Sequence, residues 1–409
     1  MTTAAEAKKA FEKAQAPRRK SDMAATDVSI DTIITALETM AEYGEPPQSI
    51  VSLLDVGSDQ YLQFFVEEIC DRLIAGGGST CRFFEGPYGA GKTHLLKLLE
   101  ERALQSGFAV VRTDLSSDLH LEDWAAITRY ILRQIQANIG GEQVRSLFNI
   151  LTALGRQGAM GSTQLKTTPM PHPGFRNAIF QALHLNQDNA AKANLLRSYL
   201  HGDKVTSAEL KRADILGVKN SLNERNAEAF IKTLTESLNI LGLSGFMLLF
   251  DENEKSFQPK SGKPSQKQLN AANLMRHLVD GCIIGTMPRT IVVFTILPGF
   301  LETMTIHYQA LGQRLAMVRD MDINGSWRWP VLSLEQVNTA AEAELFLQQA
   351  IARLCEVVSQ CGLATDGLAP TMHQWGSRII EQNAGAGYKR DLMKRLAGLA
   401  IEQIRGKTR

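Results

Sequence analysis

The sequence predicts an α/β fold in which a mainly parallel sheet is flanked by helices. Two observations carry this prediction. Short apolar runs rich in β-branched residues, such as 290–297, suit strands of a parallel sheet that is buried on both faces. A glycine-rich stretch at 86–93 stands between another apolar run and an amphipathic helical pattern, which is the strand–loop–helix order of a phosphate-binding loop, or P-loop.

Composition narrows the class of protein. The chain has 409 residues, of which 44% are hydrophobic and 21% charged, so it can form a core, and its length suggests about two or three domains. The net charge of +1 gives no global attraction for nucleic acid, so any DNA-binding patch has to be local. The five cysteines form no C-x-x-C pair and read as thiols of a cytoplasmic protein. No apolar run approaches the roughly 20 residues that span a membrane.

The N-terminal region is expected to be an arm followed by helices. Residues 1–27 lack the apolar core of a signal peptide and are predicted to be disordered. Residues 28–78 show helical spacing at 30–43 and again at 59–74. Because this segment leads directly into the strand before the glycine-rich loop, we expect it to pack against the domain that contains the loop.

Residues 86–93 read G-x-x-x-x-G-K-T, between the strand-like run 81–85 and a helical pattern. Glycines let backbone N–H groups surround an anion, and a helix N-terminus adds its positive end. Lys92 would reach the β- and γ-phosphates of a nucleoside triphosphate, and the Thr93 hydroxyl would hold Mg²⁺. The alternative is a glycine-rich turn, which the flanking pattern disfavours. The predicted nucleotide-binding residues here are Gly86, Pro87, Tyr88, Gly89, Ala90, Gly91, Lys92, Thr93 and His94.

The remaining elements extend this P-loop core over residues 79–334. Further strands are predicted at 108–114, 245–252, 290–297 and 329–334. A long, polar and mostly helical insert is expected over about 117–240, and its stretch from 155 to 173, rich in Gly, Thr, Gln and Pro, is expected to be an exposed loop. Residues 335–409 predict three helices that form a compact C-terminal lid.

Two strand ends carry candidate catalytic groups. Asp251 at the end of a buried strand would hold the Mg²⁺ shell, and Glu252 would orient or polarise the attacking water. Acids also begin surface loops, but their coupling to a P-loop favours the catalytic reading. Thr295, at the end of the next strand, would point at the γ-phosphate. A buried threonine with a satisfied hydroxyl explains that position equally well.

Arginine can stabilise the charge that develops in phosphoryl transfer. Arg314 lies near a helix end after the Thr295 strand and could act across a subunit boundary, with Arg289 and Arg319 as alternatives. Arg390 opens the last helix and would reach the nucleotide from the lid, so it joins the predicted nucleotide-binding residues. An exposed helical arginine is the ordinary alternative for each.

The order of these features resembles an AAA+-type ATPase. The stretches 84–93, 108–116, 196–202 and 242–254 are more particularly similar to the BrxC/BrxD-type ATP-binding proteins of BREX bacteriophage-exclusion systems, and by size to the BrxD-like members. The resemblance implies an ATPase that uses ATP and Mg²⁺, forms homo-oligomers and works with other phage-defence proteins, such as a helicase or a methyltransferase. The chain departs from compact AAA+ modules by its insert, because Asp251 follows Lys92 by 251 − 92 = 159 positions. Asn253 is a second departure.

Two function classes follow from this reading. One is an ATPase motor or switch that drives assembly of a DNA-directed defence complex. The other is a nucleotide-gated scaffold that binds ATP and recruits partners with little hydrolysis. Glu252 favours the first, since a pure binder needs no water-orienting acid. A P-loop kinase acting on a small molecule is disfavoured by the long insert and the helical lid.

Overall fold

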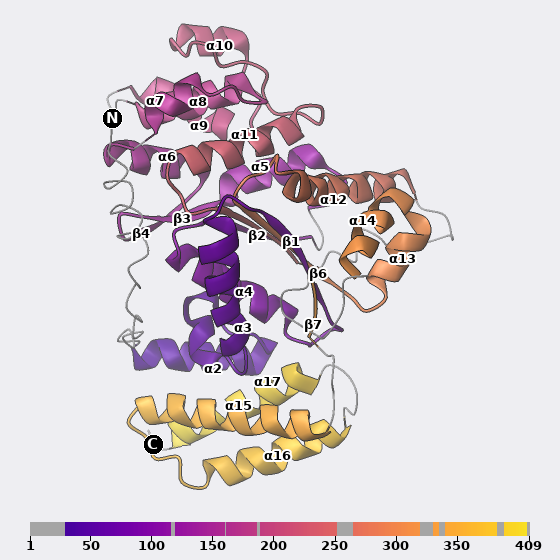
Figure 1. The fold of residues 1–409 in the computed structure, drawn as a ribbon. Coiled ribbons are helices and arrows are strands. Elements are labelled where there is room, and N and C mark those ends of the chain that lie inside the picture. Colours follow the sequence, from indigo (N-terminus) through magenta and orange to yellow (C-terminus); the bar gives the residue numbers. More distant parts are fainter. Residues whose placement is uncertain are drawn as a thin grey trace, which may run out of the picture.

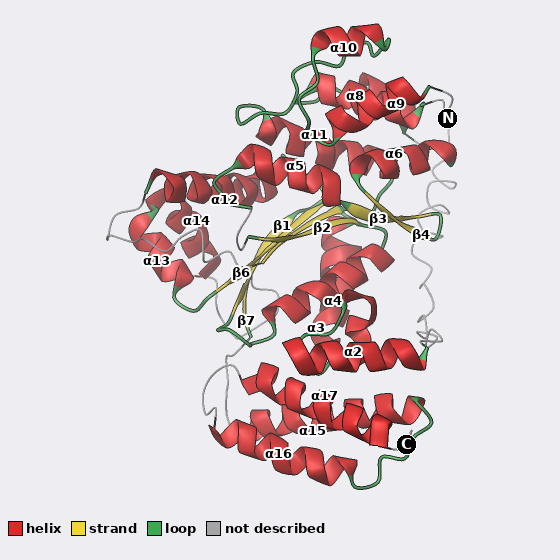
Figure 2. Cartoon of the chain, turned by 180° about the vertical axis from the view of Figure 1, so that it is seen from behind, coloured by secondary structure: helices red, strands yellow, loops and turns green. Residues whose placement is uncertain are grey.

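The computed structural model describes residues 29–115, 119–159, 161–185, 189–251, 265–319, 330–334, 340–382 and 388–406. A seven-stranded, mostly parallel sheet lies between two layers of helices, and a helical bundle lies beyond one end of its strands (Figure 1). Seen from behind, the helices α5 and α12 cover one face of the sheet, and α3 and α4 lie on the other (Figure 2). The mixed α/β class predicted from the sequence is therefore confirmed. The predicted N-terminal arm, 1–27, lies outside the described residues.

The sheet has the strand order β4-β3-β2-β5-β6-β1-β7. Its strands are β1 (Thr80–Glu85), β2 (Ala109–Asp114), β3 (Gln136–Ile139), β4 (Glu142–Arg145), β5 (Phe246–Asp251), β6 (Thr290–Ile296) and β7 (Val331–Ser333). Five of them run parallel, and β3 and β4 add an antiparallel hairpin at one edge. The hairpin lies in the insert and was not predicted. Its turn is Gly140-Gly141, both at positive φ, which glycine adopts readily.

Alternate residues of each central strand face opposite helical layers, as the two-residue period of a strand requires. On one face the rings of Phe83 and Phe250 stack on Phe294, with centroids 5.7 and 4.9 Å away, in the core shared with α12 (Gln266–Ile284) and the insert. On the other face Phe84 and Val293 pack with α3 (Asp59–Phe64), the π-helical segment η2 (Phe65–Ile74) and α4 (Lys92–Gln105). Both faces are buried, which explains the uniformly apolar strand sequences.

The insert forms a helical layer over one face. Its helices are α5 (Trp124–Gln134), α6 (Leu147–Arg156), α7 (Ser162–Thr167), α8 (Pro173–Leu183), α9 (Ala190–Leu200), α10 (Ser207–Arg212) and α11 (Ala227–Ile240). The described residues of 155–173 are mostly exposed or half-buried, as expected, but the stretch is not a loop throughout, because α7 lies within it and Leu165 is fully buried. Gly155 lies directly against the backbone of α8, where an added Cβ would stand 2.1 Å from the Leu183 carbonyl oxygen. Glycine here marks close packing rather than a turn.

The C-terminal helices α15 (Ala340–Gln360), α16 (Leu368–Gln382) and α17 (Tyr388–Gly406) form a bundle that also includes α2 (Ile30–Tyr43). The apolar face of α2, with Ile33, Leu37 and Met40, belongs to the bundle core. The expectation that the whole N-terminal segment packs on the P-loop core is therefore wrong for α2. It holds for α3 and η2, while the 3-10 segment η1 (Gln48–Leu54) contacts both cores.

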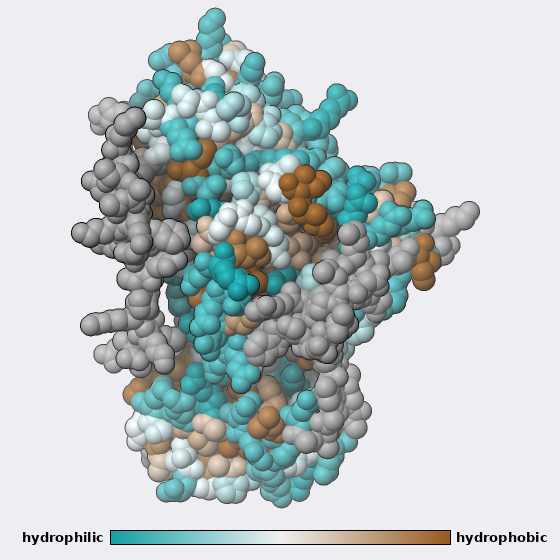
Figure 3. Space-filling model, in the orientation of Figure 1, coloured by the Kyte–Doolittle hydropathy of each residue, from teal (hydrophilic) through white to brown (hydrophobic). Residues whose placement is uncertain are grey.

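After β6 the chain forms α13 (Phe300–His307) and α14 (Gln309–Arg319), which lie beside α12 (Figure 1). The surface in Figure 3 is mostly hydrophilic, with scattered hydrophobic groups. Among the exposed large hydrophobic side chains are Ile283, Ile284 and Ile306. In the part of the chain that the structure describes, no helix is long and apolar enough to cross a membrane.

Candidate functional site

The glycine-rich loop connects the end of β1 to the start of α4, as predicted from the sequence. Gly89 and Gly91 have φ angles of 82° and 94°, in the left-handed region where other residues are strained. Gly86 is closely approached, because a Cβ there would stand 2.9 Å from the Ala90 Cβ. The loop thus has tight, glycine-dependent backbone geometry immediately before a helix N-terminus, which is the arrangement that holds phosphate in other proteins.

Lys92 is the first residue of α4, and its side chain folds back over the loop. Its Nζ donates to the carbonyl oxygens of Gly86, at 2.5 Å, and Pro87, at 2.9 Å. The ammonium also lies 5.6 Å from the centre of the Tyr88 ring. The side chain is buried, so solvent screens its charge less than it would at an exposed position. Thr93 follows in the first turn, half-buried and at the border of the same cavity.

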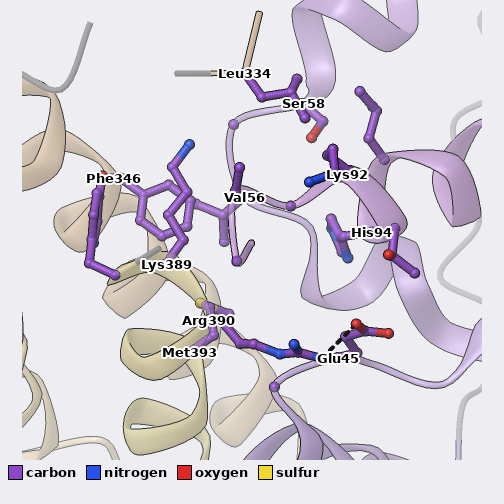
Figure 4. A pocket seen from close by; sticks show the side chains of 18 of the residues that line it. Glu45, Val56, Ser58, Lys92, His94, Leu334, Phe346, Lys389, Arg390 and Met393 are labelled. Carbon is purple, nitrogen blue, oxygen red and sulfur yellow. Dashed lines mark hydrogen bonds and ion pairs between the residues drawn. The ribbon is translucent and has the colours of Figure 1, made fainter. Parts of the chain in front are cut away.

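His94 connects the P-loop helix to a segment that the sequence reading did not assign to the site. Its Nε2 lies 3.0 Å from Oδ1 of Asp55. Val56 and Ser58, which come shortly after Asp55 in the chain, line the cavity beside the P-loop (Figure 4). His94 was predicted to contact nucleotide, and in the structure it lines the cavity and also holds the Asp55 loop against α4.

The acid-bearing strand β5 is separated from β1 by β6. This order places Thr295, at the end of β6, between the P-loop strand and Asp251. The Thr295 hydroxyl donates to Oδ1 of Asp251 at 2.7 Å, and both side chains are buried. Of the two readings open for Thr295, this contact matches the buried threonine with a satisfied hydroxyl. A role toward the γ-phosphate stays a prediction. Glu252 lies outside the described residues.

A cavity of about 620 Å³ opens in front of the loop. Its walls come from the P-loop, the segment 44–61, β7 and the bundle, and Asp251 lines it as well. Figure 4 shows apolar side chains from three different segments around this space, namely Val56, Leu334 and Phe346. Lys389 passes over the Phe346 ring, with Nζ 5.3 Å from its centre. The volume falls in the range of ligand pockets, which is about 300–1,000 Å³.

Arg390 lies in the cavity wall at the start of α17 (Figure 4). Its Nη2 is 2.9 Å from Oε1 of Glu45, and its Nε donates to the Tyr43 carbonyl oxygen at 3.1 Å. The other predicted arginines lie elsewhere. Arg314 pairs with Asp280 of α12 at 3.0 Å and does not line the cavity.

The two alternatives to Arg314 are placed as follows. Arg289 stands at the amino end of β6, opposite the P-loop end, and its Nη2 donates to the Ala75 carbonyl oxygen at 3.4 Å. The side chain of Arg319 lies outside what the structure describes.

Sequence reasoning missed the contribution of the segment between α2 and α3 and of the bundle residues Phe346 and Lys389. The available signal was a cluster of apolar residues, including Leu53, Leu54 and Val56, in the break between two predicted helices. The bundle residues carried no comparable signal, because a side chain on a helix surface gives no indication of which segment faces it.

A family model described as "BREX system ATP-binding protein BrxC/D" matches residues 27–147 and 171–362. Comparison with curated proteins finds no match. The matched ranges include the P-loop, Asp251, Thr295 and the Asp55 segment, and they stop before α16 and α17. Because they cover most of the chain, it belongs to the family of BREX system ATP-binding proteins BrxC/D.

Proposed function

We propose that this chain binds ATP with Mg²⁺ at the P-loop and hydrolyses it, within an AAA+-like P-loop module. One observation carries the proposal. The carboxyl ends of β1, β6 and β5 bring Lys92, Thr295 and Asp251 to one end of the sheet, and a cavity of about 620 Å³ opens there. Ligands of open α/β sheets bind at this edge of the strands.

The residues at the cavity fit the groups of an ATP–Mg²⁺ complex. Lys92 would neutralise the β- and γ-phosphates, and the N-terminus of α4 would face them. Thr93 and Asp251 offer the oxygen ligands that Mg²⁺ prefers, and the ion would supply further neutralisation of phosphate charge. The apolar wall of Val56, Leu334 and Phe346 suits the purine base.

Hydrolysis needs a water molecule aligned with the γ-phosphorus and its leaving oxygen. We assign the alignment of that water to Glu252, which directly follows Asp251. The attacking oxygen forms the new P–O bond, the bond to the β-phosphate oxygen breaks, and the products are ADP and phosphate. Arg314 is a candidate to stabilise the charge from a neighbouring subunit.

Within the BREX system the chain would act as a motor or switch together with other defence proteins, directed to DNA and assembled as a homo-oligomer. The nucleotide-gated scaffold is the competing class. It predicts ATP binding of normal strength with turnover that does not depend on Glu252.

Lys92→Met tests the proposal, because it keeps most of the side-chain volume and removes the ammonium. ATP affinity measured by calorimetry with Mg²⁺ should fall at least about ten-fold, and turnover should be lost. Lys267→Met is the matched control, since this lysine is largely exposed and pairs with Glu122 only at 3.8 Å. A folded Lys92→Met protein that hydrolyses ATP at the wild-type rate would rule the P-loop site out.

A further inference from the structure

We propose that Glu45 is a positioning residue that aims Arg390 at the terminal phosphate of the nucleotide. This inference rests on the proposed ATP site. It gives a role to the segment between α2 and α3 and to the C-terminal bundle, which Glu45 connects to the P-loop helix α4.

Three consecutive residues form a seat for Arg390. The Tyr43 carbonyl oxygen accepts from its Nε at 3.1 Å, and Glu45 Oε1 accepts from its Nη2 at 2.9 Å. Between them Gly44 has φ of +75°, and a Cβ there would stand 2.6 Å from Arg390 Cγ. The alkyl stem therefore lies directly on a glycine, while its guanidinium is held at two points. Figure 4 shows the side chain extending from α17 to Glu45.

The same carboxylate also reaches the P-loop helix. Glu45 Oε2 is 3.2 Å from Nζ of Lys97, which lies on α4 and also donates to the Pro46 carbonyl oxygen at 3.0 Å. The Gln48 side chain donates to the Lys97 carbonyl oxygen, again at 3.0 Å. Lys97 is largely buried. Glu45 thus connects the helix that begins at Lys92 with the arginine of the lid.

The physical effect of such a seat is preorganisation. A free arginine side chain samples many rotamers, and a ligand that uses it must restrict them. When the protein has already fixed the rotamer, that entropic cost does not weaken binding. Arg390 lies in the cavity wall, and our proposal assigns its guanidinium to the terminal phosphate. Because only ATP carries that phosphate, the proposal predicts that the effect is larger for ATP than for ADP.

The opposite effect of Glu45 on ATP affinity also has a defined physical cause. If the Glu45 carboxylate competes with phosphate for Arg390, its removal frees the guanidinium and takes a negative charge away from the pocket. ATP would then bind more tightly, and the preference for ATP over ADP would rise, because ATP carries more negative charge.

Glu45→Ala distinguishes these effects in calorimetric titrations with ATP and ADP in the presence of Mg²⁺. Positioning predicts about five-fold weaker ATP binding, the scale of ordering one long side chain, and a lower ratio of ATP to ADP affinity. Arg390→Ala should show the same two changes, and Glu45→Ala should then add little in the Arg390→Ala background. Glu38→Ala is the matched control, because the Glu38–Arg405 pair also joins α2 to α17 but does not line the cavity.

Tighter ATP binding, an unchanged affinity ratio, or effects that add in the double variant would each overturn the inference. If the Glu45→Ala protein does not fold, Arg390→Lys supplies the test, since it keeps the charge but cannot make both contacts, and it should lower the affinity ratio. The Lys92→Met result separates failure of the Glu45 inference from failure of the proposed ATP site. Normal ATP binding by that variant would refute the ATP site itself, whatever Glu45 does.

Discussion

Thr295→Val tests the hydrogen bond between Thr295 and Asp251 at the proposed Mg²⁺ site. Valine matches threonine in shape, so it removes the hydroxyl without leaving a cavity. The hydroxyl donates to Asp251 Oδ1 at 2.7 Å, and both side chains are buried. The change therefore leaves the carboxylate in place and removes one donor that orients it.

The magnitude follows from the charge of the acceptor. A hydrogen bond to a charged group contributes about 1.5–3 kcal/mol, and a partner that orients a metal ligand typically changes metal affinity or activity by about 10- to 100-fold. We expect Thr295→Val to require at least about ten-fold more Mg²⁺ for half-maximal ATP binding. ATP affinity without Mg²⁺ should change little, because the lysine and the loop remain intact.

The assay is a titration of Mg²⁺ at fixed nucleotide, read by the fluorescence of a labelled ATP. Thr295→Ser keeps the hydroxyl and loses only the methyl group, so its Mg²⁺ requirement should stay close to that of the wild type. A Thr295→Val protein with wild-type Mg²⁺ dependence refutes the reasoning. Lost turnover at unchanged Mg²⁺ affinity would instead assign the hydroxyl to the γ-phosphate or its water.

Three further predictions concern other groups. Glu252→Gln should retain ATP binding while turnover, measured as phosphate release, falls by about 10² or more; an unchanged rate would place the catalytic acid elsewhere. Wild-type turnover per subunit should rise with protein concentration, and Arg314→Ala should lower that turnover. Asp280→Asn should leave turnover unchanged; equal losses in both variants would mean that the Arg314–Asp280 pair is structural. Burial lowers the pKa of His172 below its ordinary 6.5, so the unfolded chain binds the proton more readily and stability should fall as pH drops below that value. The free energy of unfolding, measured in urea, should depend less on pH for His172→Asn, which keeps a side-chain acceptor for the Phe175 N–H. An unchanged pH dependence of that free energy would exclude this histidine as the cause.

The parallel strands could be predicted because full burial on both faces imposes a simple sequence pattern, as in the run 290–297. The β3–β4 hairpin could not be found in the same way. Its strands are only four residues long. β4, at the sheet edge, is largely polar, and β3 alternates polar residues with the buried Ala137 and Ile139. The turn Gly140-Gly141 was the usable signal, and it stood between helical patterns that outweighed it.

The placement of the candidate site residues at the strand ends could be predicted for a similar reason. A P-loop has a fixed spacing, so the sequence alone places Lys92 and Thr93 at the start of the helix after β1, and an apolar run that ends in an acid places Asp251 at the end of β5. The sequence did not indicate that β6 separates β5 from β1. That order is a property of the sheet, and it is what brings Thr295 into contact with Asp251.

The side of the cavity formed by the C-terminal bundle could not be predicted from the sequence. The apolar face of α2 predicts burial but does not name a partner, and α17, which is more than 300 positions away, presents an equally ordinary pattern. Gly44 reads as a helix C-cap, which it is, with φ of +75°. The same glycine also admits the stem of Arg390, and no local pattern encodes that approach. The apolar packing of α2 against α17 therefore brings residues 43–45 next to Arg390, and the polar contacts of Glu45 are a consequence of that packing.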